Sequence, residues 1–371
     1  MTLTSTQEHD ELRATVRRFL TEKSPSAAVR HWMESDQGHD PAVWRQLAEQ
    51  LGLHGLALPE EYGGAGGGAV ELGIVLEEMG RVLLPSPYFA TVALAGQAIA
   101  ACGDETAKAR WLPAIADGSL TATLAVAESS GSWQLSDITT AATRDGDGWT
   151  LSGTKMFVVD GHTADLLLIV ARTDAGPGLF AVDGDASGVT RVQLETLDPT
   201  RRLARIDLTG APAQRVGPDG DASAYLRTVL DLVVVALAAE QVGGAQACLD
   251  TAVEYAKIRV QFDRPIGSFQ AIKHKCADML LQIESARSAV YHAASVAAEG
   301  ADSLPVAAAL AAAYCANAFT NAAKENIQIH GGIGYTWEHD AHLYLKRAKS
   351  SEQLFGGPAT HRARLAGLVG I

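Results

Sequence analysis

The sequence predicts an α+β protein with an N-terminal α-helical domain, a middle antiparallel β domain and a C-terminal four-helix bundle. Apolar residues recur with helical spacing at both ends of the chain, whereas short runs of alternating apolar and polar residues fill the middle. Glycine, aspartate and proline separate these runs, as turns between strands require. Because 371 residues exceed one ordinary hydrophobic core, we expect domains at residues 1–119, 120–220 and 221–371.

Three segments indicate the N-terminal helical domain. Residues 8–20, EHDELRATVRRFL, place four apolar side chains on one helical face: Leu12, Val16, Phe19 and Leu20. Residues 40–52, DPAVWRQLAEQLG, begin with an Asp-Pro pair, which suits the first turn of a helix, and end at a glycine. A glycine-rich loop at 60–68 precedes a further helical pattern at 69–83. We therefore expect this domain to be all-α.

Short alternating runs predict the strands of the middle domain. They lie at residues 121–128, 149–161, 165–172, 178–183 and 204–210. An Asp-Gly-Asp-Gly run at 145–148 is a good signal for a tight hairpin. We therefore expect a small antiparallel β domain inserted between the helical ones.

Long alanine-rich helical patterns follow in the C-terminal domain, at residues 222–260, 269–300 and 303–332, before a closing helical segment. Their apolar faces are too broad for one small bundle to bury. We therefore expect a four-helix bundle whose outer faces meet other subunits.

Composition argues against several classes of protein. The net charge of −13 disfavours nucleic-acid binding, which requires a basic surface. The four cysteines are widely spaced, and the histidines lack a third ligand at metal spacing, so we expect no metal site. The N-terminus lacks the apolar core of a signal peptide, and runs such as VLDLVVVALAA are too short and interrupted to span a bilayer. We expect a cytoplasmic protein that does not enter a membrane.

Four motifs give the chain a family resemblance. They are LALPEEYGG at 56–64, LSGTKMFVVDGHTADLLLIVAR at 151–172, YAKIRVQFDRPIGSFQAIKHKCADM at 255–279 and QIHGGIGYTWEHDAHLYLKRA at 328–348. In this order and at these spacings, the chain resembles the acyl-CoA dehydrogenase family over nearly its whole length. The resemblance implies an FAD-dependent dimer or tetramer that oxidises the Cα–Cβ bond of an acyl-CoA thioester. An electron-transfer flavoprotein or a similar acceptor would then take the electrons.

The resemblance also assigns residues to the dinucleotide end of FAD. Arg259 matches an arginine that meets the pyrophosphate, a role that suits a permanently charged guanidinium. Gln328, Gly331 and Gly332 match a loop near the adenosine half of a neighbouring subunit's cofactor, where glycine lets the backbone come close. Asp263 stands where the family usually has glycine. The other matching residues are Gln261, Phe262, Phe269 and Gln270.

The flavin end of the expected site departs from the family pattern. Val126 and Ser132, in LAVAESSGS, fit the family segment, and Phe157 fits an aromatic residue beside the isoalloxazine. Ala127, however, replaces the usual threonine, and Val159 stands where a serine or threonine hydroxyl often points at the flavin. Two polar contacts to the ring are therefore missing, although backbone amides could replace them.

Neither place where the family carries its catalytic base holds an acidic residue. Phe355, directly before a glycine, takes the main place, and Val233 takes the alternative one. Neither side chain can accept a proton, so a general base must come from elsewhere.

Two other carboxylates are weak candidates for the base. Glu352 lies one helical turn before the phenylalanine. Glu240 lies two turns beyond the valine in an apolar stretch, where a carboxylate needs a partner or a raised pKa. We favour a structural role for both. Asp231 matches a family aspartate near the acyl-CoA substrate, but Val234 replaces the arginine that usually accompanies it.

Three functions are compatible with this pattern. The chain resembles subunits of heteromeric bacterial acyl-CoA dehydrogenases that lack the usual glutamate. The first possibility is therefore a subunit whose partner carries the base, or a non-catalytic chain that completes the partner's FAD site. Alternatively, it is a self-sufficient homo-oligomer that uses a displaced carboxylate such as Glu352. The third possibility is another class on the same fold, either a flavin monooxygenase or a scaffold.

Overall fold

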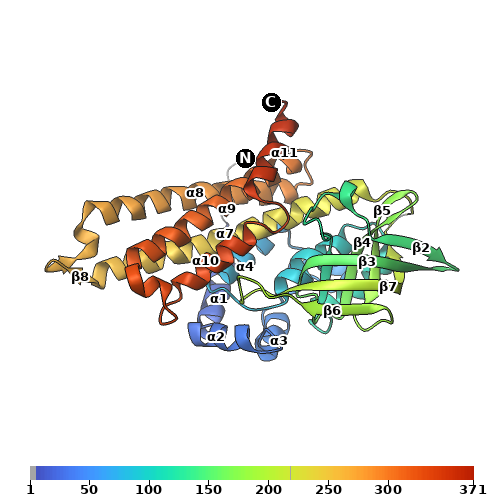
Figure 1. Cartoon of the computed structure of the whole chain (residues 1–371), viewed down its shortest axis with the longest axis horizontal. Coiled ribbons are helices and arrows are strands. Elements are labelled where there is room, and N and C mark those ends of the chain that lie inside the picture. The colour runs from blue at the N-terminus through green and yellow to red at the C-terminus, as the bar shows by residue number, and fades with distance from the viewer. Residues whose placement is uncertain (1–5, 218) are drawn as a thin grey trace. The chain divides into compact units, whose positions relative to one another are not determined.

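The computed structural model describes residues 6–217 and 219–371 (Figure 1). The chain forms two compact units. The helical unit consists of the residues up to His31, Ala69–Leu84 and Val234–Ile371. The mixed unit consists of Trp32–Gly68 and Pro85–Val233. The helix α7 (Ser223–Ile258) begins in the mixed unit and continues into the helical unit.

The helical unit is built mainly from long helices. They are α1 (Gln7–Lys23), the first part of α2 (Ser26–Glu34), α4 (Ala69–Arg81), α7, α8 (Gln270–Ala298), α9 (Leu304–His330), α10 (Ala341–Ser351) and α11 (Pro358–Val369). Short connecting elements are β8 (Val260–Gln261), β9 (Arg264–Pro265) and the 3₁₀ helices η4 (Ile266–Ser268) and η5 (Gly331–Tyr335). α9 packs on α8, α10 and α11 (Figure 1). This arrangement confirms the expected C-terminal helical domain.

Small side chains explain why the alanine-rich helices pack closely. The core of this region contains Cys248, Ala252, Met279, Ile283, Phe319 and Ala323. A Cβ atom added at Gly244 would lie only 2.4 Å from the ring of Phe319, so α7 and α9 approach each other where one side has no side chain. Such close contact buries apolar surface without leaving voids.

Local capping residues fix the starts of the N-terminal helices. In α1, the hydroxyl of Thr6 accepts a hydrogen bond from the His9 amide at 3.2 Å. In α3 (Pro41–Glu49), the Asp40 carboxylate accepts from the Ala42 amide at 2.8 Å, so the start predicted from the Asp-Pro pair is confirmed. Val16 and Leu20, on the predicted apolar face of α1, are fully buried.

The mixed unit contains short helices and one seven-stranded sheet. Besides α3, the helices are η1 (Glu60–Tyr62), the π-helix η2 (Phe89–Gly96), α5 (Gln97–Ala100), α6 (Glu105–Ala116) and η3 (Leu135–Asp137). The strands are β1 (Ala122–Ala125), β2 (Ala141–Asp145), β3 (Gly148–Val159), β4 (Leu166–Thr173), β5 (Gly176–Asp183), β6 (Val189–Gln193) and β7 (Leu203–Val216). The strands β4, β2, β3, β7 and β5 are neighbours in this order, and β5 also pairs with β4. β1 pairs with β4, and β6 pairs with β7.

The prediction of an antiparallel β domain was wrong in part, because the sheet is mixed. β1 pairs with β4 in parallel, from Ala122 opposite Leu166 to Ala125 opposite Ile169. A parallel pair needs a long crossover, and residues 126–165, which include the β2–β3 hairpin, provide one. The remaining neighbours are antiparallel except for a single parallel pairing of β2 with β4.

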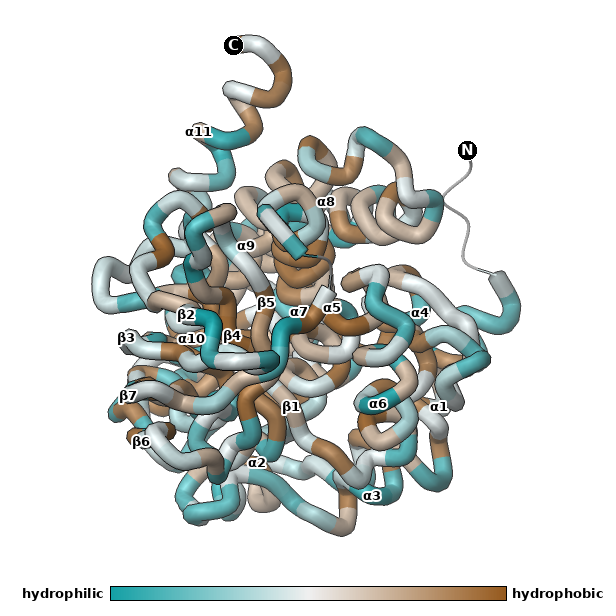
Figure 2. Tube along the Cα trace, turned by 90° about the vertical axis from the view of Figure 1, so that its right-hand side faces the viewer, coloured by the Kyte–Doolittle hydropathy of each residue, from teal (hydrophilic) through white to brown (hydrophobic). Residues whose placement is uncertain are grey.

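The predicted tight hairpin is confirmed at the Asp-Gly-Asp-Gly run. Asp145 of β2 pairs with Gly148 of β3, which leaves a two-residue turn. Gly146 takes a positive φ of 57°, a conformation that glycine adopts at little cost. β4 is apolar along most of its length (Figure 2). Its residues from Leu166 to Ala171 are buried.

Two helical segments of the described chain are long and apolar enough to cross a membrane, namely Ser223–Ile258 and Leu304–Tyr335. The expectation that the apolar runs are too short was therefore wrong for length. In the most apolar window of each segment, 89% and 72% of the residues are buried inside the protein. Packing within the fold accounts for their apolar character, and no membrane is indicated.

A buried histidine makes the mixed unit sensitive to acid. The ring of His54 is fully buried between Trp44 and Tyr88, with ring centroids 3.9 and 5.6 Å away. Neither ring nitrogen has a hydrogen-bond partner among the described residues. Burial lowers the pKa of His54 to about 3 from an ordinary value of 6.5. At pH values between about 3 and 6.5, the ring is therefore neutral in the folded chain but protonated in the unfolded chain.

We expect the His54→Leu variant to lose less stability than the wild type between pH 7 and pH 5. Below the ordinary histidine pKa, His54 binds a proton in the unfolded state but not in the folded state. The free energy of unfolding of the wild type therefore falls as the pH falls toward the folded-state pKa. At pH 5 this single group costs about 2 kcal/mol. Urea unfolding of both proteins at the two pH values checks the prediction, and equal losses in both would contradict it.

Candidate cofactor site

An exposed hairpin follows the end of α7 and contains Arg259. The amide of Arg259 donates to the Tyr255 carbonyl at 2.9 Å, and its carbonyl accepts from the Ile266 amide at 2.8 Å, so both ends of the hairpin are fixed. The turn residues Phe262 and Asp263 have positive φ values of 53° and 59°. Glycine adopts such positive φ values most easily and is common in tight hairpin turns. A glycine at position 263, as the resemblance would lead one to expect, would therefore relieve backbone strain in this turn.

The hairpin exposes apolar and charged side chains together. Phe262 is 86% exposed, Val260 52% and Ile258 75%. Phe262 contacts Phe269 edge-to-face at 6.1 Å, so the structure brings these two predicted residues together. Arg259 and Gln261 are exposed, and no described carboxylate lies within ion-pair distance of the Arg259 guanidinium. Gln270 begins α8 and is also exposed.

The second predicted element is the glycine turn at the end of α9. Gln328 is exposed in the last turn of α9, and Gly331 begins η5 with a φ of 66°. A Cβ atom added at Gly331 or Gly332 would meet no atom within 4 Å. The backbone at this turn is therefore open to a ligand, as a glycine loop that cradles a nucleotide must be.

A stack of aromatic rings joins the two elements within the helical unit. The rings of Tyr255 and His330 stack with centroids 4.2 Å apart. Tyr255 lies one helical turn before Arg259, and His330 lies two residues after Gln328. The His330 ring also lies 4.2 Å from that of His339, and its Nδ1 donates to the Asn326 carbonyl at 2.8 Å. The predicted residues of the dinucleotide end are thus held on one framework.

The predicted flavin-end residues lie in two neighbouring segments of the mixed unit. Val126 is buried directly after β1, and the Ala127 carbonyl accepts from the Met156 amide at 2.9 Å. Phe157 is half-buried and has a positive φ of 57°, within a register irregularity between β3 and β7. Ser132 donates to Asp137 at 2.6 Å.

Val159 lies at the end of β3 with its side chain buried. Its carbonyl accepts a hydrogen bond from Thr123 at 2.6 Å. The side chain itself offers no donor, so any polar contact from this position must come from the backbone.

A buried ion pair that was not predicted from the sequence links these segments. Lys155 is fully buried in β3, and its Nζ donates to Glu128 Oε1 at 2.8 Å and to the Val126 carbonyl at 3.0 Å. Burial lowers the pKa of Lys155 to about 8. Burial would raise the pKa of Glu128, but the Lys155 charge and several hydrogen bonds outweigh it and lower that pKa to about 2. The burial of Lys155 could have been predicted from the alternation of side chains along a strand, which places it on the same face as the buried Leu151.

Phe355 occupies a tight, buried corner between α10 and α11. It is 5% exposed, with a φ of 58°, and the following Gly356 has a φ of 105°. A phenyl ring at this position offers no group that could remove a proton.

The alternative carboxylates have protein partners. Glu240 pairs with Arg347 at 2.8 Å, and both side chains are no more than 5% exposed. Glu352 pairs with Lys349 and accepts from the Thr320 hydroxyl at 3.4 Å. Asp231, which was predicted as a substrate contact and not as a base, is 2% exposed in the first part of α7, within the mixed unit.

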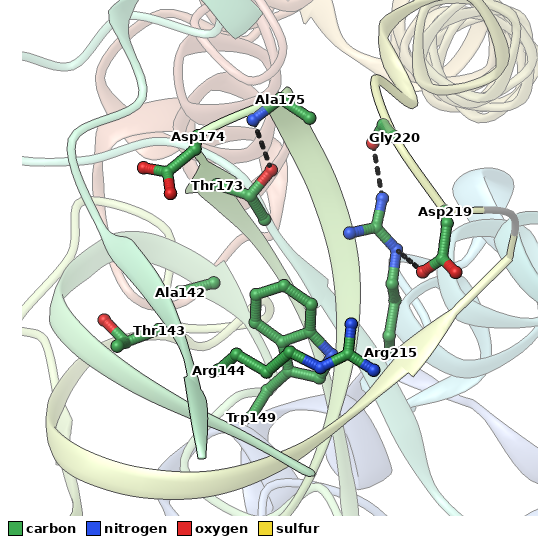
Figure 3. Close-up of a pocket in the computed structure, with 10 residues that line it drawn as sticks. All are labelled: Ala142, Thr143, Arg144, Trp149, Thr173, Asp174, Ala175, Arg215, Asp219 and Gly220. Carbon is green, nitrogen blue, oxygen red and sulfur yellow. Dashed lines mark hydrogen bonds and ion pairs between the residues drawn. The ribbon is translucent and has the colours of Figure 1, made fainter. Parts of the chain in front are cut away.

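A polar pocket of about 480 Å³ opens at one end of the β sheet of the mixed unit (Figure 3). Arg144 and Arg215 lie over the Trp149 ring at 5.6 and 5.7 Å. Arg215 is also held by the Gly220 carbonyl at 2.5 Å and by Asp219 at 3.8 Å. The lining contains none of the predicted site residues. Both arginines and aspartates line the pocket, so its lining carries charges of both signs.

Among residues 6–217 and 219–371, no group of three potential metal ligands occurs. The histidines near the glycine turn contact aromatic rings instead: His342 lies edge-on to Trp337 at 4.5 Å, beside the His330–His339 contact.

The chain matches three domain descriptions of one protein family over most of its length. The descriptions "Acyl-CoA dehydrogenase, N-terminal domain", "middle domain" and "C-terminal domain" match residues 6–119, 123–209 and 224–367. The chain is 39% identical over 366 residues to acyl-CoA dehydrogenase IpdE2 of Mycobacterium tuberculosis, covering 98% of each protein.

Two solved assemblies show the same fold. A subunit of the Tcur3481-Tcur3483 steroid ACAD, in its G363A variant, superimposes with a TM-score of 0.90 at 35% identity, over 98% of each chain. A subunit of the ChsE4-ChsE5 complex of Mycobacterium tuberculosis gives 0.91 at 29% identity, over 100% of this chain and 99% of that one. The chain therefore belongs to the acyl-CoA dehydrogenase family, whose members are flavoprotein oxidoreductases.

Proposed function

We propose that the chain is one subunit of an oligomeric FAD-dependent acyl-CoA dehydrogenase that forms the α,β double bond of an acyl-CoA thioester. The observation that supports the proposal is that Arg259, Gly331 and Gly332 are exposed, whereas Phe355 is buried. The resemblance predicts nucleotide binding for the first three positions and the catalytic base for the last. FAD, when bound, would accept the β-hydrogen as hydride. This chain would contribute to cofactor binding, and a partner would contribute the base.

The residues of the dinucleotide end fit a flavin nucleotide. Among residues 6–217 and 219–371, no carboxylate lies within ion-pair distance of Arg259, so its guanidinium would be available for the pyrophosphate oxygens. Gly331 and Gly332 leave the backbone open for the adenosine half. The exposed Phe262 and its neighbours in the hairpin form an apolar surface that a cofactor or a second subunit would cover.

At the flavin end, we assign backbone groups in place of the missing hydroxyls. Val126, Phe157 and Val159 would line the isoalloxazine, with Ser132 in the loop beside it. Asp231 would lie near the acyl-CoA. The catalytic site of this chain would hold the cofactor and exclude water, while the proton would be removed by a carboxylate of the partner.

The assembly is proposed from the same features. We propose that the C-terminal helices form a four-helix bundle that presents the FAD-binding and oligomerisation surfaces. The Tcur3481-Tcur3483 and ChsE4-ChsE5 proteins are pairs of different chains, and the first is named a steroid ACAD. By analogy we propose a hetero-oligomer in the cytoplasm with a bulky acyl-CoA substrate and an electron-transfer flavoprotein as acceptor.

Flavin content tests the proposal. The chain is purified alone and together with the acyl-CoA dehydrogenase family protein encoded beside it, and FAD is measured per chain. We expect substantial FAD and acyl-CoA-dependent bleaching without oxygen only for the pair. Bleaching by the chain alone, lost in the Glu352→Gln variant, would show a self-sufficient enzyme. Turnover that requires oxygen and reduced flavin would show a monooxygenase.

We expect the Arg259→Gln variant to bind FAD about tenfold to a hundredfold more weakly, because one charge-assisted contact to phosphate contributes about 1.5–3 kcal/mol. Equilibrium dialysis of FAD against the assembled protein measures this loss. Arg18→Gln is a matched control, since Arg18 is an exposed arginine of α1 far along the chain from both nucleotide elements. An equal effect of both substitutions would contradict the assignment of Arg259.

A further inference from the structure

The two segments assigned to the flavin end are held together by one buried charged pair. The ammonium group of Lys155 contacts the Glu128 carboxylate at 2.8 Å and the Val126 carbonyl at 3.0 Å. The next residue of β3, Met156, donates its amide to the Ala127 carbonyl at 2.9 Å. Three consecutive residues after β1 are therefore tied to two consecutive residues of β3.

The Glu128 carboxylate extends this link to the start of β2. Its Oε2 accepts from the Thr139 amide at 2.8 Å and from the Thr139 hydroxyl. Its Oε1 accepts from the Thr140 amide at 2.8 Å, in addition to the lysine. A carboxylate with this many donors stays ionised in a buried place. The carboxylate thus accepts four hydrogen bonds, the ammonium group donates two, and the pair fixes three stretches of backbone at once.

The linked backbone is irregular, so it needs such support. Phe157 follows directly with a positive φ of 57°, which costs free energy for a residue with a side chain. The β3–β7 register shifts between Lys155 and Val158. On the same strand, a Cβ atom at Gly153 would lie 2.6 Å from the Thr140 hydroxyl, so β2 and β3 are in close contact. Unsupported, this stretch would relax toward a regular strand.

We propose that Lys155 and Glu128 are positioning residues that set the backbone of residues 126–128 and 155–159 for contact with the isoalloxazine. The inference rests on the proposed function. Ala127 and Val159 carry no hydroxyl, so polar contacts to the ring from these positions must come from backbone groups. Backbone groups discriminate between oxidised and reduced flavin only when they are rigidly placed. The pair is buried, so it would supply that rigidity through its hydrogen bond to Val126 and through the neighbouring Met156–Ala127 hydrogen bond.

The test uses the assembled protein and the double variant Glu128→Gln/Lys155→Met. Removing both charges avoids leaving either one buried and alone, so this variant is expected to fold. The single variant Lys155→Arg tests rescue, because it keeps the charge. The matched control is Glu105→Gln/Lys108→Met, which removes an ion pair of 2.9 Å in α6 of the same unit, where Glu105 is exposed and Lys108 is partly buried.

For the double variant we expect amide exchange at Thr139, Thr140 and Met156 to become about tenfold faster. We also expect FAD binding to weaken about tenfold or more, with a shifted visible spectrum and flavin midpoint potential. Lys155→Arg should restore part of each property, and the control should change none. A merely structural role would lower the unfolding midpoint while leaving the spectrum and potential of bound flavin unchanged, and that result would overturn the inference.

Failure of the inference can be distinguished from failure of the proposed function. If the wild-type assembly binds FAD and the double variant binds it with the same affinity, spectrum and potential, only the positioning role is wrong. If the wild-type assembly binds no FAD, the proposed function itself is wrong, and the positioning role falls with it.

Discussion

Replacing Gly243 by alanine is expected to lower the stability of the helical unit by about 3 kcal/mol or more, which is the upper range for overpacking a core. A Cβ atom at this position would lie 1.8 Å from the backbone carbonyl oxygen of Glu77 in α4. The opposing glycine is equally constrained: a Cβ at Gly80 would lie 2.1 Å from the Glu240 carbonyl oxygen in α7. The two helices thus touch backbone to backbone, and neither can move without breaking the other contact.

A second glycine-to-alanine variant isolates this steric effect from helix propensity. Gly367 lies in α11, is exposed and has no atom within 4 Å of an added Cβ. Alanine is a better helix former than glycine, so Gly367→Ala should raise stability by about 0.5–1 kcal/mol. Urea unfolding followed by circular dichroism measures both changes. A loss at Gly243 no larger than about 0.5 kcal/mol would show that the crossing of α4 and α7 can relax.

Features set by neighbouring residues could be predicted from the sequence. The Asp40 cap of α3, the two-residue hairpin at Asp145–Gly148 and the buried face of α1 each depend on a few positions close along the chain. Capping, turn chemistry and hydrophobic period are local signals, so they are visible without the fold. The order of helical and strand segments follows from the same signals.

Features that depend on residues far apart in the sequence could not be predicted from local sequence patterns. The parallel pairing of β1 with β4 joins segments separated by the β2–β3 hairpin, and no residue in either strand specifies parallel rather than antiparallel pairing. Lys155 and Glu128 stand in separate runs, and only the fold brings their charges together. The resemblance predicted which residues would contact FAD, but the stack of Tyr255 on His330, which joins the two elements that carry them, could be found only in the structure.

Removing the charge of Arg347 alone is expected to destabilise the helical unit by about 3–5 kcal/mol, because it leaves a buried carboxylate without its cation. Arg347 is 2% exposed and Glu240 is 4% exposed, so water cannot take the place of the missing partner. In Arg347→Met the Glu240 carboxylate must either stay charged at that cost or take up a proton, which makes the loss larger at high pH than at low pH.

The double variant Glu240→Gln/Arg347→Met separates a structural role from a catalytic one. Without either charge, most of the stability lost in Arg347→Met should return. A structural pair predicts that activity of the assembled protein follows this recovery, because the partner supplies the base. If the double variant regains stability but remains inactive, and Glu240→Gln alone is inactive and stable, then Glu240 removes the proton. In that case the buried arginine serves to keep the Glu240 carboxylate ionised rather than to fasten α10 to α7.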